Sequence, residues 1–196
     1  MNRAAAEEAI LDRYPNIFPA EPDGSRLPFA CGEGWFQIVE HLCATVQSYI
    51  DHTEVPVADA DGGSLMLSPP QLVFDTIKEK LGTGRFYETL APFPAEVVEA
   101  VPKATLSQLR ALFAEKYEGM ILFAEHLTAV TCEACGRPGE LLSRKGYLGT
   151  RCPECAKRAG FKPRPAPGSP STRLRLTQRL VEVRDRRTST PSKSDL

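Results

Sequence analysis

Apolar residues recur every three to four positions along three stretches of the chain, which is the spacing of one face of an α-helix. The stretches are 34–51, 71–81 and 105–127, and we expect a helix in each. In the longest stretch, Thr105 and Gln108 match a capping box at the helix start. Its predicted buried stripe consists of Leu106, Leu109, Leu112, Phe113, Tyr117, Met120, Phe123, Ala124 and Leu127. The pattern predicts a body built around helices.

Shorter segments connect these helices. Residues 3–13 are rich in Ala and Glu and predict a short helix that a following proline ends. The stretches 15–28 and 52–70 are rich in Pro, Gly and Asp, and we expect loops in both. Residues 85–87 suit an edge strand or an extended segment, and residues 95–100 suit a single helical turn.

The aromatic residues near these segments are predicted to lie in the core rather than to bind a ligand. They are Trp35, Phe36, Phe86 and Tyr87. We expect Arg85, beside two of them, either to pair with an acidic residue of the body or to lie on the surface.

Composition places the chain among globular proteins. Of its 196 residues 42% are hydrophobic and 25% are charged, so most of the chain can bury enough apolar surface to fold. Residues 1–13 have no unbroken apolar stretch, and the run 120–124 is far shorter than the roughly 20 apolar residues that a membrane-spanning helix needs. We therefore expect a cytoplasmic protein without membrane association.

The formal net charge of −1 conceals a division along the chain. Residues 1–131 hold 9 Lys and Arg against 19 Asp and Glu, a net charge of −10, whereas residues 132–196 hold 15 against 6, a net charge of +9. A basic segment of this kind commonly meets phosphates, an acidic protein surface or the protein's own acidic face. The sequence does not choose among the three.

The last part of the chain predicts a flexible tail. Residues 162–170 contain four prolines, which predict an extended, semi-rigid spacer. Beyond it, apolar residues alternate with arginines as in a strand, while Leu176, Leu180 and Val183 equally suit one face of a helix. A short apolar and basic segment after such a spacer often becomes ordered only on a partner.

Four cysteines give the strongest chemical signal in the sequence. Cys132 and Cys135, and then Cys152 and Cys155, form two C-x-x-C units separated by 16 residues. Two thiolates on one tight turn can point at a single ion, and two such turns complete a tetrahedron with Zn–S distances of about 2.3 Å. The spacing predicts one structural zinc ion, because four thiolates leave no open coordination position for catalysis.

Other interpretations of the cysteines are weaker. Two disulfides are disfavoured in a reducing cytosol, and a thioredoxin-like redox site would not need a second pair. Residues 140–144 and 147–151 predict a hairpin between the pairs, which is the plan of a zinc ribbon. A second metal site from Cys31 and Cys43 with a nearby histidine is disfavoured, because Cys43 lies on the apolar face of its predicted helix.

Three motifs occur in one order along the chain: CGEGW at 31–35, KEKLGTGRFY at 78–87, and CEACGRPG at 132–139 followed by CPEC at 152–155. Over residues 28–158 the chain thereby resembles a group of small phage and prophage proteins of unassigned function that end in a zinc ribbon. It departs from their usual pattern at Glu33, Leu81 and Gly84. The resemblance implies a phage-linked accessory role, exerted by binding host machinery or defence components, and it supplies no catalytic residues.

The sequence therefore predicts a mainly α (α+β) protein with three parts. These are an acidic, mainly helical body over residues 1–130, a hairpin or treble-strand zinc ribbon over residues 131–160, and a basic, largely disordered tail over residues 161–196. No catalytic triad, phosphate-binding glycine loop or catalytic carboxylate pair can be placed, so we expect no enzyme. The leading hypothesis is a regulatory factor that docks and modulates a host or defence protein.

The alternative hypothesis is a nucleic-acid-binding regulator whose basic ribbon and tail contact phosphates. The candidate residues are Arg137, Arg144, Lys145 and Arg151 on the ribbon and Arg173, Arg175, Arg179, Arg184, Arg186 and Arg187 in the tail. The charge of −10 on the body argues against tight DNA binding unless the body faces away.

Overall fold

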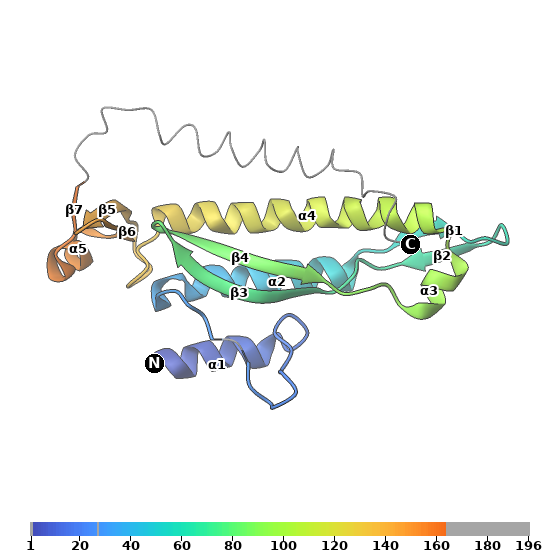
Figure 1. Cartoon of the computed structure of the whole chain (residues 1–196), viewed down its shortest axis with the longest axis horizontal. Helices are drawn as coiled ribbons and strands as arrows, with labels where there is room; N and C mark the ends of the chain where they lie inside the picture. Colours follow the sequence, from blue (N-terminus) through green and yellow to red (C-terminus); the bar gives the residue numbers. More distant parts are fainter. Residues whose placement is uncertain (1, 27, 164–196) are drawn as a thin grey trace, which may run out of the picture. The chain divides into compact units, whose positions relative to one another are not determined.

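Two long helices and a two-stranded sheet form the centre of the structure (Figure 1). Helix α2 spans Phe36–His52 and helix α4 spans Lys103–Val130. The antiparallel strands β3 and β4 span Leu72–Lys80 and Thr83–Leu90. Helix α4 packs against both α2 and β4. The core between these elements is apolar and includes Val39, Cys43, Val46, Leu72, Phe74, Ile77, Phe86, Phe113, Tyr117, Ile121 and Ala124.

The computed structural model describes residues 2–26 and 28–163. Residues 1–163 make up one compact unit, and the predicted division between body and ribbon after residue 130 stays a prediction. The predicted spacer and basic tail, from residue 164 onward, lie outside the described residues. Within the part of the chain that is described, no helix combines the length and the hydrophobicity that crossing a membrane requires.

Smaller elements surround this centre. Helix α1 begins after Asn2, whose side chain accepts a hydrogen bond from the Ala4 N–H, and ends before the proline as predicted. The Arg3 guanidinium donates to the carbonyls of Phe29 and Cys31, both at 2.7 Å, which ties α1 to the chain before α2. The bounds of these elements are α1 Arg3–Arg13, the 3₁₀ turn η1 Glu33–Trp35, β1 Val55–Ala58, β2 Ser64–Leu67 and α3 Ala95–Ala100.

The chain after α4 folds into what we call the cysteine module, residues 131–163. Its three antiparallel strands lie in the order β6-β5-β7, and α5 connects β6 to β7. The bounds are β5 Glu140–Arg144, β6 Tyr147–Arg151, α5 Pro153–Ala159 and β7 Lys162–Pro163. The predicted hairpin between the cysteine pairs is confirmed.

The prediction of a mainly α protein is wrong. Of the described residues 45% are helical and 25% lie in strands, in several small sheets, so the fold is mixed α/β. The clearest error is the helix expected over residues 71–81, which is strand β3. A β-bulge between Phe74 and Thr76 shifts the inward side of this strand. Leu72, Phe74 and Ile77 are therefore all buried, and their spacing imitates one face of a helix.

The loop expected over residues 52–70 contains the hairpin β1–β2. Asp59 shapes its connecting turn, because its Oδ1 atom accepts the N–H groups of Asp61 and Gly63 at 3.0 and 2.7 Å. The loop was predicted from the Pro, Gly and Asp content of residues 52–70. That content comes largely from the turn, and the apolar strands on either side of it are too short to outweigh it.

Helix α4 differs from its prediction in two respects. It begins at Lys103 after Pro102, with no capping hydrogen bond from a side chain, so the expected capping box is not formed. Most of the predicted stripe is buried or half-buried, but Leu112, Phe123 and Leu127 are exposed. The helix therefore has apolar residues on a second face as well as toward the core.

Three of the four aromatic residues predicted for the core are buried: Trp35, Phe36 and Phe86. Tyr87 is 39% exposed, and the Lys78 ammonium lies 4.4 Å from its ring centroid. Arg85 pairs with the buried Glu125 of α4 at 3.6 Å, which matches the expected pairing with an acidic residue of the body.

Candidate metal centre

Four cysteines from the two ends of the module converge at one point. Cys132, Cys135, Cys152 and Cys155 are free thiols whose Sγ atoms all lie within 4.8 Å of one another. The Sγ atoms of Cys135 and Cys152 are 3.6 Å apart. A tetrahedral site with metal–sulfur distances of about 2.3 Å places its sulfurs about 3.8 Å apart, whereas a disulfide needs about 2.05 Å. The group could therefore hold a metal ion such as zinc.

A tight turn brings the first two cysteines together. The Cys132 carbonyl accepts the N–H groups of Cys135 at 3.2 Å and of Gly136 at 2.8 Å. Gly136 has a φ of +75°, which favours glycine because a side chain there would be strained. The Cys132 N–H donates back to the Arg137 carbonyl at 2.7 Å, which closes the turn. This geometry explains why the sequence places glycine directly after the pair.

The second pair lies at the start of α5. Cys152 is the N-cap residue of this helix, and its Sγ atom accepts the Cys155 N–H at 3.5 Å. Pro153 occupies the first helical position, where its missing N–H costs nothing. Gly160, with a φ of +72°, ends the helix. The helix start thus fixes the direction of both thiol groups.

The pKa values of two of the four thiols are shifted in opposite directions. The Arg137 side chain lowers the pKa of Cys135 to about 6. Desolvation by burial raises the pKa of Cys155 to about 12, and the Arg158 guanidinium lies 3.4 Å from its Sγ atom. Since metal ligands bind as thiolates, metal binding would release the remaining protons.

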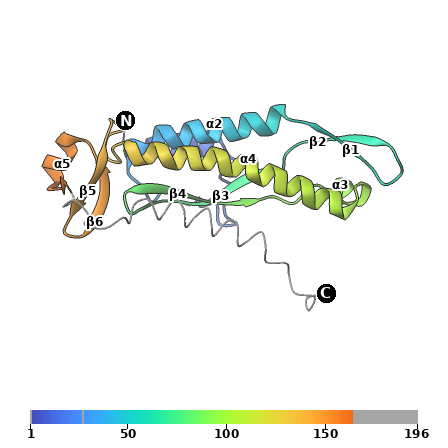
Figure 2. The same cartoon turned by 90° about the horizontal axis from the view of Figure 1, so that it is seen from above.

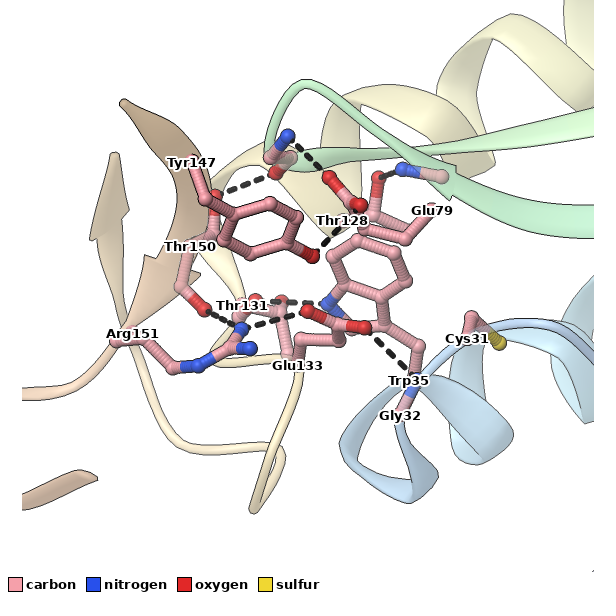
Figure 3. A network of polar contacts seen from close by, with 12 residues as sticks. Cys31, Gly32, Trp35, Glu79, Thr128, Thr131, Glu133, Tyr147, Thr150 and Arg151 are labelled. Carbon is pink, nitrogen blue, oxygen red and sulfur yellow. Dashed lines mark hydrogen bonds and ion pairs between the residues drawn. The ribbon is translucent and has the colours of Figure 1, made fainter. Parts of the chain in front are cut away.

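The turn of the first pair packs directly on the chain that leads into α2 (Figure 3). The Gly34 N–H donates to the Glu133 carbonyl at 2.9 Å, and the Trp35 indole N–H donates to the Thr131 carbonyl at 2.8 Å. A Cβ atom on Gly34 would lie 2.3 Å from the Cys132 carbonyl oxygen, and one on Gly32 would lie 2.2 Å from that of Glu133. Only glycines allow this approach.

The Glu133 carboxylate connects the body with the strands of the module. Its Oε1 atom accepts the Gly32 N–H at 3.0 Å, and its Oε2 atom accepts a hydrogen bond from Arg151 of β6 at 2.6 Å (Figure 3). Both side chains are largely buried, with 10% of Glu133 and 14% of Arg151 exposed. Each charge therefore depends on the other, because an unpaired buried charge is costly.

A third contact joins the module to the turn between β3 and β4. The buried Thr150 hydroxyl donates to the Gly82 carbonyl at 2.6 Å, and the Tyr147 hydroxyl donates to the Glu79 Oε2 atom at 2.7 Å. Burial, and after it the bond to Glu79, raises the pKa of Tyr147 to about 12. The turn is also bonded to α4, because the Thr128 hydroxyl accepts the Gly84 N–H at 2.7 Å. The module is thus hydrogen-bonded to two segments of the body, residues 32–35 and the β3–β4 turn.

The basic residues predicted for phosphate contact on the module are mostly engaged within the protein. Arg137 pairs with Glu154 at 2.5 Å, and Arg151 pairs with Glu133. The Arg144 guanidinium lies 5.2 Å from the Phe161 ring centroid and donates to a carbonyl of α5. Lys145 is exposed at the tip of the hairpin. The six candidate arginines of the tail, from residue 173 to residue 187, lie outside the described residues.

The two cysteines outside the group lie in the core. Cys31 and Cys43 are buried in the core, where desolvation raises the pKa of both thiols. Among the described residues, the four cysteines of the module are the only group of three or more Cys, His, Asp or Glu that could hold a metal ion.

Sequence reasoning missed the residues that hold the module in place. Glu133 and Thr150 are neighbours of the ligands and carry no signal by themselves. The glycines at 32 and 34 and the Leu81-Gly82 turn belong to two of the motifs noted above. Repeated glycines in short motifs are a signal of close backbone approach, and that signal could have identified these contacts.

No family model, curated protein or solved structure matches the chain. The resemblance to phage proteins therefore has no support beyond the motifs that suggest it.

Proposed function

We propose that this is a non-enzymatic protein in which one structural zinc ion fixes the cysteine module against the body. The convergence of four Sγ atoms within 4.8 Å carries the proposal. Four thiolates fill a tetrahedral shell, which leaves no position for a substrate or an activated water. The surroundings fit this role, because Cys132, Cys152 and Cys155 are buried and their neighbours make hydrogen bonds to the body.

The zinc-fixed surface serves, in this proposal, to bind another protein. The partner is a host or defence protein that the chain docks and modulates as a phage-type accessory factor in the cytoplasm. The phage connection rests on the three sequence motifs alone. A protein partner is favoured over nucleic acid because three of the four basic candidates on the module already contact other residues of the protein.

The contacts of the module weigh against the nucleic-acid alternative. A phosphate would have to displace Glu154 from Arg137, and Glu133 from the largely buried Arg151. Breaking the largely buried Arg151–Glu133 pair is strongly unfavourable, whereas the exposed Arg137–Glu154 pair is broken at little cost. Of the four candidates on the module, only Lys145 lies exposed at the hairpin tip with no such contact to another described residue.

The test of protein binding is affinity capture followed by reconstitution. Full-length protein, a variant ending at Pro163 and the metal-free variant Cys132→Ser with Cys152→Ser are immobilised and exposed to nuclease-treated host lysate. Ending at Pro163 keeps β7 and the buried Phe161 in place. We expect one protein to be retained by the first two forms, lost with the metal-free variant, and bound at a fixed ratio when purified.

A different result of the same capture experiment would favour nucleic-acid binding. If only nucleic acid is recovered without nuclease, and if it disappears when the chain ends at Pro163, the protein is a nucleic-acid binder. The log of its affinity should then fall linearly with the log of salt concentration.

A further inference from the structure

The four cysteines of the module differ in how easily a small molecule can reach them. Cys132, Cys152 and Cys155 are buried, with 0%, 3% and 3% of each residue exposed, whereas Cys135 is exposed. An ion bound among the four sulfurs would occupy the inner side of Cys135 and leave its outer side open. A dissolved oxidant therefore meets Cys135 before it meets the other three cysteines.

An open hollow lies on this outer side. Figures 1 and 2 both show the cysteine module at the end of the body where α4 ends and α2 begins. There Cys135 lines a hollow of about 390 Å³ together with Ala6, Glu33, Gly34, Phe36 and Ala134. The hollow has room for a small molecule beside Cys135.

The buried Cys152 lies close enough to Cys135 for a disulfide to form between them. Their Sγ atoms are 3.6 Å apart, and a disulfide needs about 2.05 Å, so the two atoms must approach by about 1.5 Å. A partial rotation about the Cα–Cβ bond of Cys135 can move its sulfur atom by that much. Since the two residues lie on different turns, this disulfide would cross-link the two C-x-x-C units.

We propose that the metal centre is a reversible oxidation site, at which a peroxide converts Cys135 and Cys152 into a disulfide and the zinc ion is released. The inference rests on the proposed function, because it requires a bound ion. It adds a regulation of the same site.

The reaction has two steps. In the first, the Cys135 thiolate attacks one oxygen of hydrogen peroxide, the O–O bond breaks, and a sulfenic acid and a hydroxide ion form. In the second, the Cys152 thiolate attacks the sulfenic sulfur, the S–S bond forms, and a second hydroxide ion leaves. Two electrons pass from the two sulfurs to the two peroxide oxygens, and two protons from solvent convert the hydroxide ions into water.

The disulfide releases the ion because it removes two of the four ligands. Cys132 and Cys155 remain, and two thiolates do not fill a tetrahedral shell. A dithiol reductant splits the disulfide by exchange, after which all four thiolates can bind zinc again. The zinc-fixed surface would thus be held only under reducing conditions.

Zinc release from the full-length protein tests the proposal. The zinc content of the reduced protein is measured first, and it reports on the proposed function alone. Hydrogen peroxide is then added together with a weak chromogenic chelator. We expect release of the bound zinc, a Cys135–Cys152 disulfide in tandem mass spectrometry, and recovery of the original zinc content after dithiol and zinc are added.

Two variants identify Cys135 as the point of attack. Cys135→His keeps a zinc ligand, for whose larger side chain the hollow leaves room, but it forms no disulfide. Its zinc should be released at least about tenfold more slowly. The control Cys31→Ser changes a buried cysteine outside the group and should release zinc at the wild-type rate. If Cys135→His binds no zinc, the disulfide found in the wild type decides by itself.

Three results would overturn the proposal. They are zinc that stays bound in a large excess of peroxide, a main product with its disulfide inside one C-x-x-C unit, and a zinc-loaded Cys135→His variant that responds like the wild type. Reduced protein without zinc would overturn the proposed function, and this inference with it.

Discussion

Glu133 shows at the scale of a single residue how the metal centre is tied to the rest of the protein. It lies between two metal-ligand positions in sequence, and its carboxylate bonds both to the Gly32 N–H and to Arg151. A charged residue in a C-x-x-C turn is normally expected to face solvent. The burial of Glu133 follows from the close approach of the glycine-containing turn, which no local pattern around Glu133 indicates.

We predict that Glu133→Gln lowers the free energy of unfolding by about 2–3 kcal/mol. The substitution leaves the largely buried Arg151 charge without its partner, and the cost lies below that of a fully buried pair because both side chains keep some exposure. Urea denaturation measures it. The control Glu140→Gln changes an exposed carboxylate on β5 and should have an effect within about 0.5 kcal/mol. Equal effects of the two substitutions would contradict the role of Glu133.

Gly34→Ala should lower stability by about 1–3 kcal/mol and weaken metal binding. The new Cβ atom would press on the backbone of Cys132, Cys135 and Gly136, at 2.3–2.6 Å. The control Glu33→Ala removes an exposed side chain from the same turn and should leave both properties unchanged. Zinc affinity by competition with a chromogenic chelator is the measurement, and a Gly34→Ala variant that binds zinc like the wild type would contradict the packing.

At the scale of elements, the sequence predicted helices where periodicity was regular and long. Helices α1, α2, α3 and α4 and the β5–β6 hairpin lie close to their predicted places. The β3 strand was missed because its bulge shifts the buried side, and β1 and β2 were missed because they are short and flank a polar turn. The exposed stripe of α4 could not be separated from the buried one, since both consist of apolar residues at helical spacing.

The turn between β3 and β4 offers a prediction at this scale. Leu81 has a φ of +56° and is 52% exposed, so it occupies a left-handed conformation without burying its side chain. Asparagine adopts this conformation more readily and is typical of such hairpin turns. Leu81→Asn should raise the melting temperature, whereas Leu81→Val should lower it because a β-branched side chain is strained there. The reverse order in calorimetry would contradict the backbone conformation.

At the scale of the whole molecule, the four ligands were predictable but their environment was not. The C-x-x-C spacing is local, so the sequence identifies it directly. The contacts from η1 and from the β3–β4 turn join residues about 70 to 100 positions apart. They join the four-cysteine group to two segments of the body, so an ion bound there would also stabilise the contacts with both.

Metal removal should therefore be visible far from the cysteines. Trp35 is the single tryptophan of the chain, is 1% exposed, and bonds to the carbonyl of Thr131 beside the first ligand. A strong chelator should shift its fluorescence to longer wavelength and lower the melting temperature. Cys132→Ser with Cys152→Ser should show the shifted emission already and no further response. Unchanged emission after complete metal removal would mean that the module stays docked without the ion.

Metal analysis of the purified full-length protein is the most direct test of the central claim, that four cysteines hold one structural zinc ion. Elemental analysis should find one zinc per chain, and Cys132→Ser with Cys152→Ser should abolish it while Cys31→Ser leaves it intact. Protein that is folded, contains no zinc and gains no stability when zinc is added would contradict the claim.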